Sequence, residues 1–197
     1  MKRILSSITA AVILLTLTIV CTQLAAADDE DMSTGTYYTS YNLWFERSTA
    51  WSLNYKKGSI IAAGTEVYNI DIKPEYIQFQ TKSDNVRHYI KYYPVHHGNM
   101  SPEAFAKRLF TKKPFEILVT GLTEEEIKSI KGGVVTAGMT KRAVLISYGY
   151  PPEHVTPSLE KKKWTYWYAT RKKKVLAFDD NGLSVTTTSP KEDDESQ

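Results

Sequence analysis

The adjacent pair His96-His97 has the clearest potential for chemistry in this sequence. It lies between Pro94 and Gly98, which predict a loop. Two imidazoles on a loop can bind a divalent metal, but a catalytic zinc site needs three protein ligands and a structural site four. His88 lies on a predicted strand nearby, and no carboxylate spacing completes a ligand set. We therefore predict a solvated loop and no metal site.

Grouped carboxylates are a second candidate. Glu124 to Glu126 and Asp179-Asp180 could serve acid–base catalysis. However, the first group opens a predicted helix and the second lies in a predicted turn, where carboxylates have structural roles. The sequence contains no nucleophile elbow, H-E-x-x-H, phosphate-loop or dinucleotide-binding motif. We predict that the protein is not an enzyme and needs no cofactor, and we keep an enzyme of unrecognised type as an alternative.

A strand rich in aromatic residues is the third candidate, and it favours binding over catalysis. Alternation along the strand places Trp164, Tyr166 and Tyr168 on one face and Trp167 on the other. One face can cover a helical hairpin. If the other face is uncovered, Trp167 is available to a partner, because exposed aromatic side chains often anchor protein interfaces. The alternative is that each half of the chain covers one face.

Two basic runs, Lys161–Lys163 and Arg171–Lys174, bracket this aromatic strand. Basic side chains beside aromatic rings suit anionic lipid headgroups, lipopolysaccharide or nucleic acid, and we keep an anionic lipid or a glycan as possible partners. The alternative is a pair of solvated loop tips. The predicted binding residues are Trp164, Tyr166, Trp167, Tyr168, Lys172 and Lys173.

Residues 1–27 have the pattern of a secretory signal peptide. A positively charged start precedes an uncharged apolar stretch, and Ala25 to Ala27 form a typical cleavage site. An uncleaved anchor is the alternative. Cys21 is the only cysteine, and the preceding Val20 fits a lipid-attachment site poorly. We therefore expect no lipid anchor at Cys21, and a mature chain without cysteine favours the bacterial periplasm or the outer-membrane periphery.

The charge of the chain does not favour a nucleic acid partner. The formal net charge of +3 falls to +1 when residues 1–27 are removed, since Lys2 and Arg3 are lost and no acid is. An exported, nearly neutral protein is a poor candidate for binding nucleic acid. The remaining residues are enough for one ordinary domain or two small ones.

The order of local signals predicts an α+β protein. Residues 36–93 alternate in short strands between turns, which is typical of a small barrel or curled sheet. Residues 94–133 change to helical signals, with helix starts at Ser101 and Thr123, and we predict a helical connector. A helix over 140–148 follows, and then strands over 164–169, 174–178 and 183–187. Residues 189–197 form a charged tail that we predict to be disordered.

The predicted helix over 140–148 is well delimited. Thr140 can cap its start, Gly149 can end it with a positive φ, and Pro151 prevents its continuation. Farther along the chain, Asp179-Asp180-Asn181-Gly182 predicts a hairpin turn.

These features resemble the SmpA/OmlA (BamE-like) family over about residues 134–185, within a predicted domain over 134–188. The similarity rests on Gly138-Met139-Thr140, Val144, Gly149, Pro151, Trp164-x-Tyr166-Trp167-Tyr168, Val175, Phe178 and Gly182. The resemblance implies a helical hairpin packed on a three-stranded antiparallel sheet and a role in envelope or outer-membrane assembly. A weaker resemblance links residues 55–67 to bacterial Src-homology-type barrels.

The sequence therefore predicts a non-enzymatic protein of the bacterial cell envelope that acts by binding a protein partner. The alternative is a module that binds lipid or the cell wall. Whether the two halves of the chain share one core is left open.

Overall fold

Short strands with alternating side chains form the first part of the protein. The computed structural model describes residues 32–185, so the predicted signal peptide and C-terminal tail lie outside the described residues. Strand β6 illustrates the alternation, because Ile77, Phe79 and Thr81 are buried and the residues between them are half-buried. The first seven strands are β1 (Tyr37–Thr39), β2 (Leu43–Phe45), β3 (Thr49–Trp51), β4 (Ser59–Ile61), β5 (Glu66–Ile72), β6 (Tyr76–Thr81) and β7 (Arg87–Lys91).

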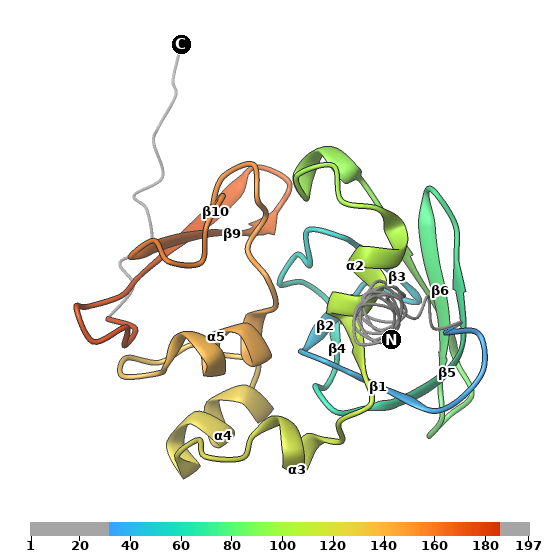
Figure 1. Cartoon of the computed structure of the whole chain (residues 1–197), viewed down its shortest axis with the longest axis horizontal. Helices are drawn as coiled ribbons and strands as arrows, with labels where there is room; N and C mark the ends of the chain where they lie inside the picture. Colours follow the sequence, from blue (N-terminus) through green and yellow to red (C-terminus); the bar gives the residue numbers. More distant parts are fainter. Residues whose placement is uncertain (1–31, 186–197) are drawn as a thin grey trace, which may run out of the picture. The chain divides into compact units, whose positions relative to one another are not determined.

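Most of these strands form one curled sheet (Figure 1). Its order is β3-β7-β6-β5-β1-β8, and all neighbours are antiparallel except β3 and β7, which are parallel. Asn85 makes the turn before β7 with a φ of 57°, and Asn69, with a φ of 49°, lies at an irregularity in the pairing of β5 with β6. The predicted α+β class, with a curled sheet in the first half, is confirmed.

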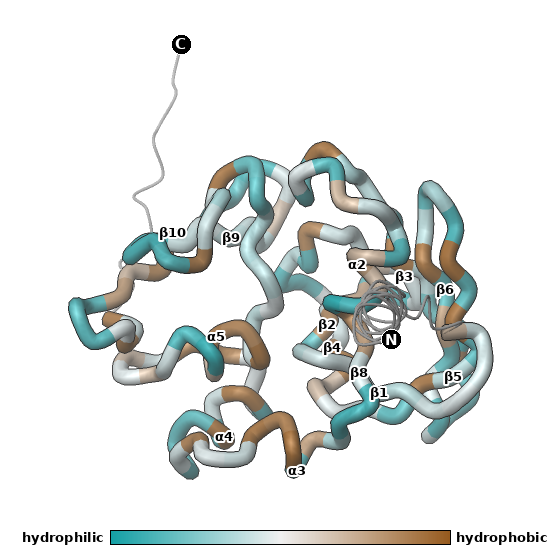
Figure 2. The backbone as a smooth tube through the Cα atoms, viewed as in Figure 1, coloured by the Kyte–Doolittle hydropathy of each residue, from teal (hydrophilic) through white to brown (hydrophobic). Residues whose placement is uncertain are grey.

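The remaining elements alternate between helix and strand. They are η1 (Pro94–His96), α2 (Pro102–Leu109), β8 (Phe110–Thr111), α3 (Phe115–Leu118), α4 (Glu124–Lys131), α5 (Lys141–Tyr148), β9 (Lys163–Ala169) and β10 (Lys172–Ala177). Figure 2 shows hydrophobic stretches on α3, α4 and α5. No helix in the described part of the chain is long and apolar enough to span a membrane.

Strand β2 lies between two hydrophobic cores. All three of its residues are buried, and alternation directs Leu43 and Phe45 into the first core and Trp44 into the second. Strand β2 pairs only with β4, outside the curled sheet. Strand β2 is therefore shared by the cores of the two halves of the chain. Residues 32–185 belong to one compact unit.

The segment 94–133, predicted as a helical connector, contributes to both cores. Helix α2 buries Phe105 and Leu109 in the first core, and β8 extends the curled sheet beside β1. Helix α4 buries Ile130 in the second core. The segment is thus part of the packing and not a link between two separate modules.

The predicted caps of α4 and α5 form, and one carboxylate joins them. Oε2 of Glu126 accepts the Thr123 amide at 3.0 Å, which completes the capping box of α4. Oε1 of Glu126 accepts the amide and the hydroxyl of Thr140, the cap of α5, at 2.8 and 2.7 Å. Burial alone would raise the pKa of Glu126, but the hydrogen bonds from Thr140 and Thr123 lower it. Glu126 thereby holds the two helix starts together.

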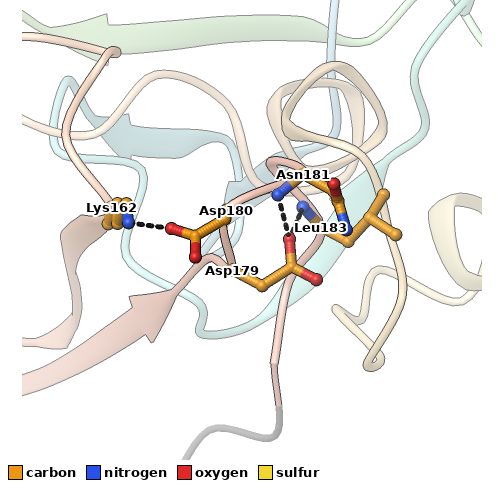
Figure 3. Close-up of polar contacts among 5 residues, drawn as sticks. All are labelled: Lys162, Asp179, Asp180, Asn181 and Leu183. Atoms are coloured by element: carbon orange, nitrogen blue, oxygen red, sulfur yellow. Dashed lines mark hydrogen bonds and ion pairs between the residues drawn. The ribbon is translucent and has the colours of Figure 1, made fainter.

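Within residues 32–185 the C-terminal sheet has two strands, and the predicted third strand, over 183–187, lies partly outside the described residues. Strands β9 and β10 pair antiparallel, and the turn after them forms where predicted: Asp179 accepts the amides of Asn181 and Leu183, and Lys162 pairs with Asp180 (Figure 3). Beyond the turn, Ser184 makes only an isolated bridge to the hairpin. Its backbone also bonds to Gly138 and Met139, before α5, and the Val185 amide donates to the carbonyl of Ala177, the last residue of β10, at 2.9 Å.

Candidate binding surface

Two of the predicted binding residues lie inside the protein. Trp164 and Tyr166 are 0% and 1% exposed and belong to the second core, so the prediction that they contact a partner is wrong. Tyr166 stacks edge-on against Tyr148 of α5 at 5.5 Å between ring centroids, and its hydroxyl donates to the Gly149 carbonyl at 2.9 Å. The helix end covers this face of β9, because it offers both an aromatic ring and a carbonyl acceptor.

The other four predicted residues lie on the surface of the β9–β10 hairpin. Tyr168 is 39% exposed, Lys172 and Lys173 are exposed, and Trp167 is half-buried. The ammonium of Lys173 lies 4.4 Å from the centroid of the Trp167 ring, in a cation–π geometry. Trp167 and Lys173 therefore remain candidates for contact with a partner.

Trp167 is one end of a chain of aromatic contacts that the sequence did not reveal. The centroid distances are 6.4 Å from Trp167 to His154, 4.7 Å from His154 to His96, 6.2 Å from His96 to Tyr93, 5.5 Å from Tyr93 to Trp51 and 6.1 Å from Trp51 to Tyr55. These six side chains, Tyr55, Trp51, Tyr93, His96, His154 and Trp167, form what we name the aromatic strip.

Both halves of the protein supply the aromatic strip. Trp51 ends β3, at the edge of the curled sheet, and Trp167 belongs to the C-terminal hairpin. The loop that carries His154 is held at the junction, because the Glu153 amide donates to the His96 carbonyl at 2.9 Å and the Glu153 carboxylate pairs with Arg108 at 2.7 Å. The aromatic strip therefore combines side chains from both halves of the protein, and the two contacts of Glu153 hold these halves together at the strip.

Parts of the aromatic strip are open to solvent. Trp51 and Tyr93 are each 39% exposed, their rings are nearly parallel at 13°, and His154 is exposed. Next to Tyr93, Val95 is 66% exposed. The Lys91 ammonium lies 5.2 Å from the Trp51 centroid, so each of the two tryptophans of the strip has a cation beside its ring.

The predicted solvated histidine loop is only partly correct. His97 is 3% exposed and stacks on Tyr92 and Phe105, whereas His96 is half-buried and faces His154. Aromatic packing draws His97 inward. The described residues contain no group of three or more His, Cys, Asp or Glu side chains that could hold a metal ion.

Acidification is expected to destabilise the protein through His97. Burial, together with the nearby His96, Arg108 and His154, lowers the pKa of His97 to about 3. The unfolded chain takes up this proton near a pKa of 6.5, so stability is lost as pH falls below 6.5 toward 3. Between about pH 7.5 and about pH 5 the loss is about 2 kcal/mol.

Urea unfolding of the protein at both pH values measures this loss. His97→Phe keeps a ring between Tyr92 and Phe105 and removes the titrating group, so its free energy of unfolding should fall less. An equal loss in the unaltered protein and in the variant would contradict the assignment to His97.

A buried amine near the junction has a structural role. Nζ of Lys56 donates to the carbonyls of Tyr148 and Asn54 at 2.5 and 3.0 Å, and it lies 4.0 Å from the centroid of Trp44. Burial lowers the pKa of Lys56 well below its usual value. Tyr148 is the last residue of α5, so the lysine satisfies a carbonyl that the helix end leaves unpaired.

Most residues of the aromatic strip were not predicted from the sequence, because little in the sequence connects them. Trp51, Tyr93 and His154 are separated by 42 and 61 positions in the sequence, and no periodicity connects them. The only hint was the aromatic content of the chain, 13 tyrosines and 4 tryptophans. Their assembly needs the parallel pairing of β3 with β7 and the contact between His96 and the loop after α5.

The fold and this surface define an α+β protein that presents a strip of aromatic rings across the junction of two cores. Comparisons add no more specific relationship, because no family model, curated protein or solved structure matches the chain. Membership in the SmpA/OmlA family therefore stays a prediction.

Proposed function

We propose that this protein is an exported, non-enzymatic protein of the bacterial cell envelope that binds a protein partner through the aromatic strip. The observation that carries the proposal is the continuous contact of six rings from Tyr55 to Trp167. Tryptophan and tyrosine are the residues most enriched among interface anchors, because they bury a large area for little loss of conformational freedom.

The position of the strip supports a role in recognition. Its rings come from separate elements whose backbones are fixed by the sheet, the hairpin and the contacts of Glu153. A surface held in this way loses little conformational entropy on binding. A role in envelope or outer-membrane assembly agrees with the signal-peptide pattern and with the family resemblance.

A second candidate function is binding to an anionic lipid or cell-wall glycan. It is favoured by the ammonium groups of Lys91 and Lys173, which lie over the rings of Trp51 and Trp167. A cation beside an aromatic ring can contact an acidic headgroup or sugar. Binding of this kind would weaken sharply as salt increases.

Alanine substitutions at the two tryptophans test the proposal. Trp51→Ala and Trp167→Ala should each reduce crosslinking of the protein to its envelope partner about tenfold or more, because a buried interface tryptophan contributes about 2 kcal/mol or more. Quantitative mass spectrometry after crosslinking in the bacterial envelope measures this. Tyr38→Ala is the control, since Tyr38 is a half-buried aromatic on β1, far from β3 in the sheet order.

The outcomes are distinct. If both tryptophan variants fold and crosslink like the unaltered protein, the aromatic strip is not the interface. If the protein is instead retained on purified peptidoglycan or on anionic vesicles, with salt-dependent loss in Lys91→Gln and Lys173→Gln, the second candidate function replaces the first.

A further inference from the structure

A pocket of about 230 Å³ that includes no residue of the aromatic strip lies where the β1–β2 loop meets α3 and α5. Tyr41 and Tyr150, whose rings meet edge-on at 6.1 Å, line it together with aliphatic side chains and two cations. The aliphatic lining includes Ile117 of α3 and Leu145 of α5. Ile117 is 53% exposed, although a large aliphatic side chain is usually covered.

The two cations of this pocket are Arg142 and Lys113. The Arg142 guanidinium donates to the Thr120 carbonyl at 2.8 Å and to the Leu118 carbonyl at 2.5 Å, which fixes its plane. A guanidinium has five N–H donors, so donors remain for a ligand. No acidic residue is among the described residues that line the pocket, so nothing in its wall neutralises the positive charge.

Apolar walls and two cations select an apolar group that carries an anion. A carboxylate matches the fork of donors on a guanidinium, and Lys113 adds a second positive charge on the pocket wall. The volume is below the roughly 300–1,000 Å³ of pockets that enclose whole drug-sized ligands. Ile117, on its wall, is 53% exposed, so the pocket opens to solvent. It therefore suits one terminal residue of a longer chain that continues outward.

We propose that this pocket binds the C-terminal residue of a polypeptide, with its aliphatic side chain against Ile117 and Leu145 and its free carboxylate at Arg142 and Lys113. The pocket and the aromatic strip share no residue, so the inference goes beyond the proposed function and does not depend on it. Capture of a terminal carboxylate is a known mode of peptide recognition.

Calorimetric titration of the protein with N-acetyl-Gly-Gly-Leu tests the proposal. We expect saturable binding of the peptide acid and about tenfold weaker binding of its C-terminal amide, because the amide lacks the charge that the cations recognise. N-acetyl-Gly-Gly-Gly should also bind about tenfold more weakly, since it has no side chain to bury.

Lys113→Gln and Arg142→Gln should each weaken binding of the peptide acid about tenfold. Because Arg142 also holds two carbonyls, Ile117→Asp is the second test. It places a negative charge at an exposed position of the wall, so it should abolish binding without unfolding the protein. Lys161→Gln, an exposed lysine outside the pocket, is the control and should bind normally.

Equal binding of the acid and the amide, or no binding by the unaltered protein at millimolar peptide, would overturn the proposal. Binding of free 4-methylpentanoate as tightly as the peptide would overturn it in favour of a small-molecule site. Trp167→Ala should leave peptide binding unchanged, so failure of the aromatic strip and failure of this pocket are distinguishable.

Discussion

Replacing Asn42 with alanine is expected to lower the free energy of unfolding by about 3–4 kcal/mol. Asn42 is 1% exposed, and its side chain makes three hydrogen bonds between distant segments. Its amide donates to the carbonyls of Ile130 and Ser147 at 2.7 and 3.2 Å, and its oxygen accepts the Ala63 amide at 2.8 Å. Alanine would remove the side-chain partner of the Ser147 carbonyl and of the Ala63 amide, whereas the Ile130 carbonyl keeps its hydrogen bond from the Gly133 amide at 3.0 Å.

The same substitution tests whether the two cores fold together. Asn42 precedes β2, the strand that contributes to both cores, and its partners lie on α4, α5 and the chain after β4. Urea unfolding monitored by tryptophan fluorescence and by far-UV circular dichroism measures the change. Asn181→Ala, at an exposed turn position, is the control and should change stability by less than about 0.5 kcal/mol. A loss below about 1 kcal/mol for Asn42→Ala would show that these bonds do not hold the junction.

The second large effect is expected at Gly149, the residue after α5. Its φ of 80° and ψ of −174° lie in a region that is essentially restricted to glycine. A Cβ there would lie 2.6 and 2.7 Å from two ring atoms of Tyr41 and 3.2 Å from Nδ2 of Asn54. Because the Tyr41 ring is buried at the junction and cannot move freely, Gly149→Ala should cost about 3 kcal/mol or more.

A second glycine provides a matched control for this prediction. Gly182 has a similar φ of 76°, but a Cβ at that position would meet no atom within 4 Å. Gly182→Ala should therefore show only the backbone cost, about 1 kcal/mol. Thermal unfolding of both variants compares a glycine crowded by Tyr41 with a glycine of similar φ whose added Cβ meets no atom. Equal losses for the two variants would mean that the contact with Tyr41 is relieved at no cost.

The two stability predictions and the aromatic strip concern the same junction. Asn54 accepts the Trp44 amide at 3.0 Å and donates to the carbonyls of Asn42 and Tyr148 at 2.9 and 3.1 Å. Tyr148 ends α5 and precedes the loop that carries His154, so we expect a change that loosens this network to affect that loop as well. Partner binding by Asn42→Ala should therefore be compared with that of Trp167→Ala only under conditions in which both variants are folded.

Much of the local structure followed from the sequence. Thr123 with Glu126, Thr140 and Ser101 cap their helices, and Asp179 forms its turn, because these side chains reach backbone groups only a few residues away. Signals of this range can be read without knowing the rest of the fold. The alternation of short strands likewise predicted the curled sheet.

Which side chains of β9 are exposed depends on packing between elements that are far apart in the sequence. Alternation correctly separated Trp164 and Tyr166 from Trp167, but it could not tell which face another element would cover. The buried face is the one that meets Tyr148 and Gly149 of the α5 end. In the described part of the expected third strand, the Ser184 backbone bonds to Gly138 and Met139, before α5, which is a long-range pairing that alternation does not specify.

The sequence by itself determined where helices begin and end, where turns occur and that this is an α+β chain, because those features depend on contacts between near neighbours. Only the tertiary structure decided that β2 contributes to two cores, that Trp164 and Tyr166 are buried, and that the six side chains of the aromatic strip lie in one series of contacts. The physical reason is that burial and ring contacts between distant residues depend on how whole elements pack, and no local pattern specifies that packing.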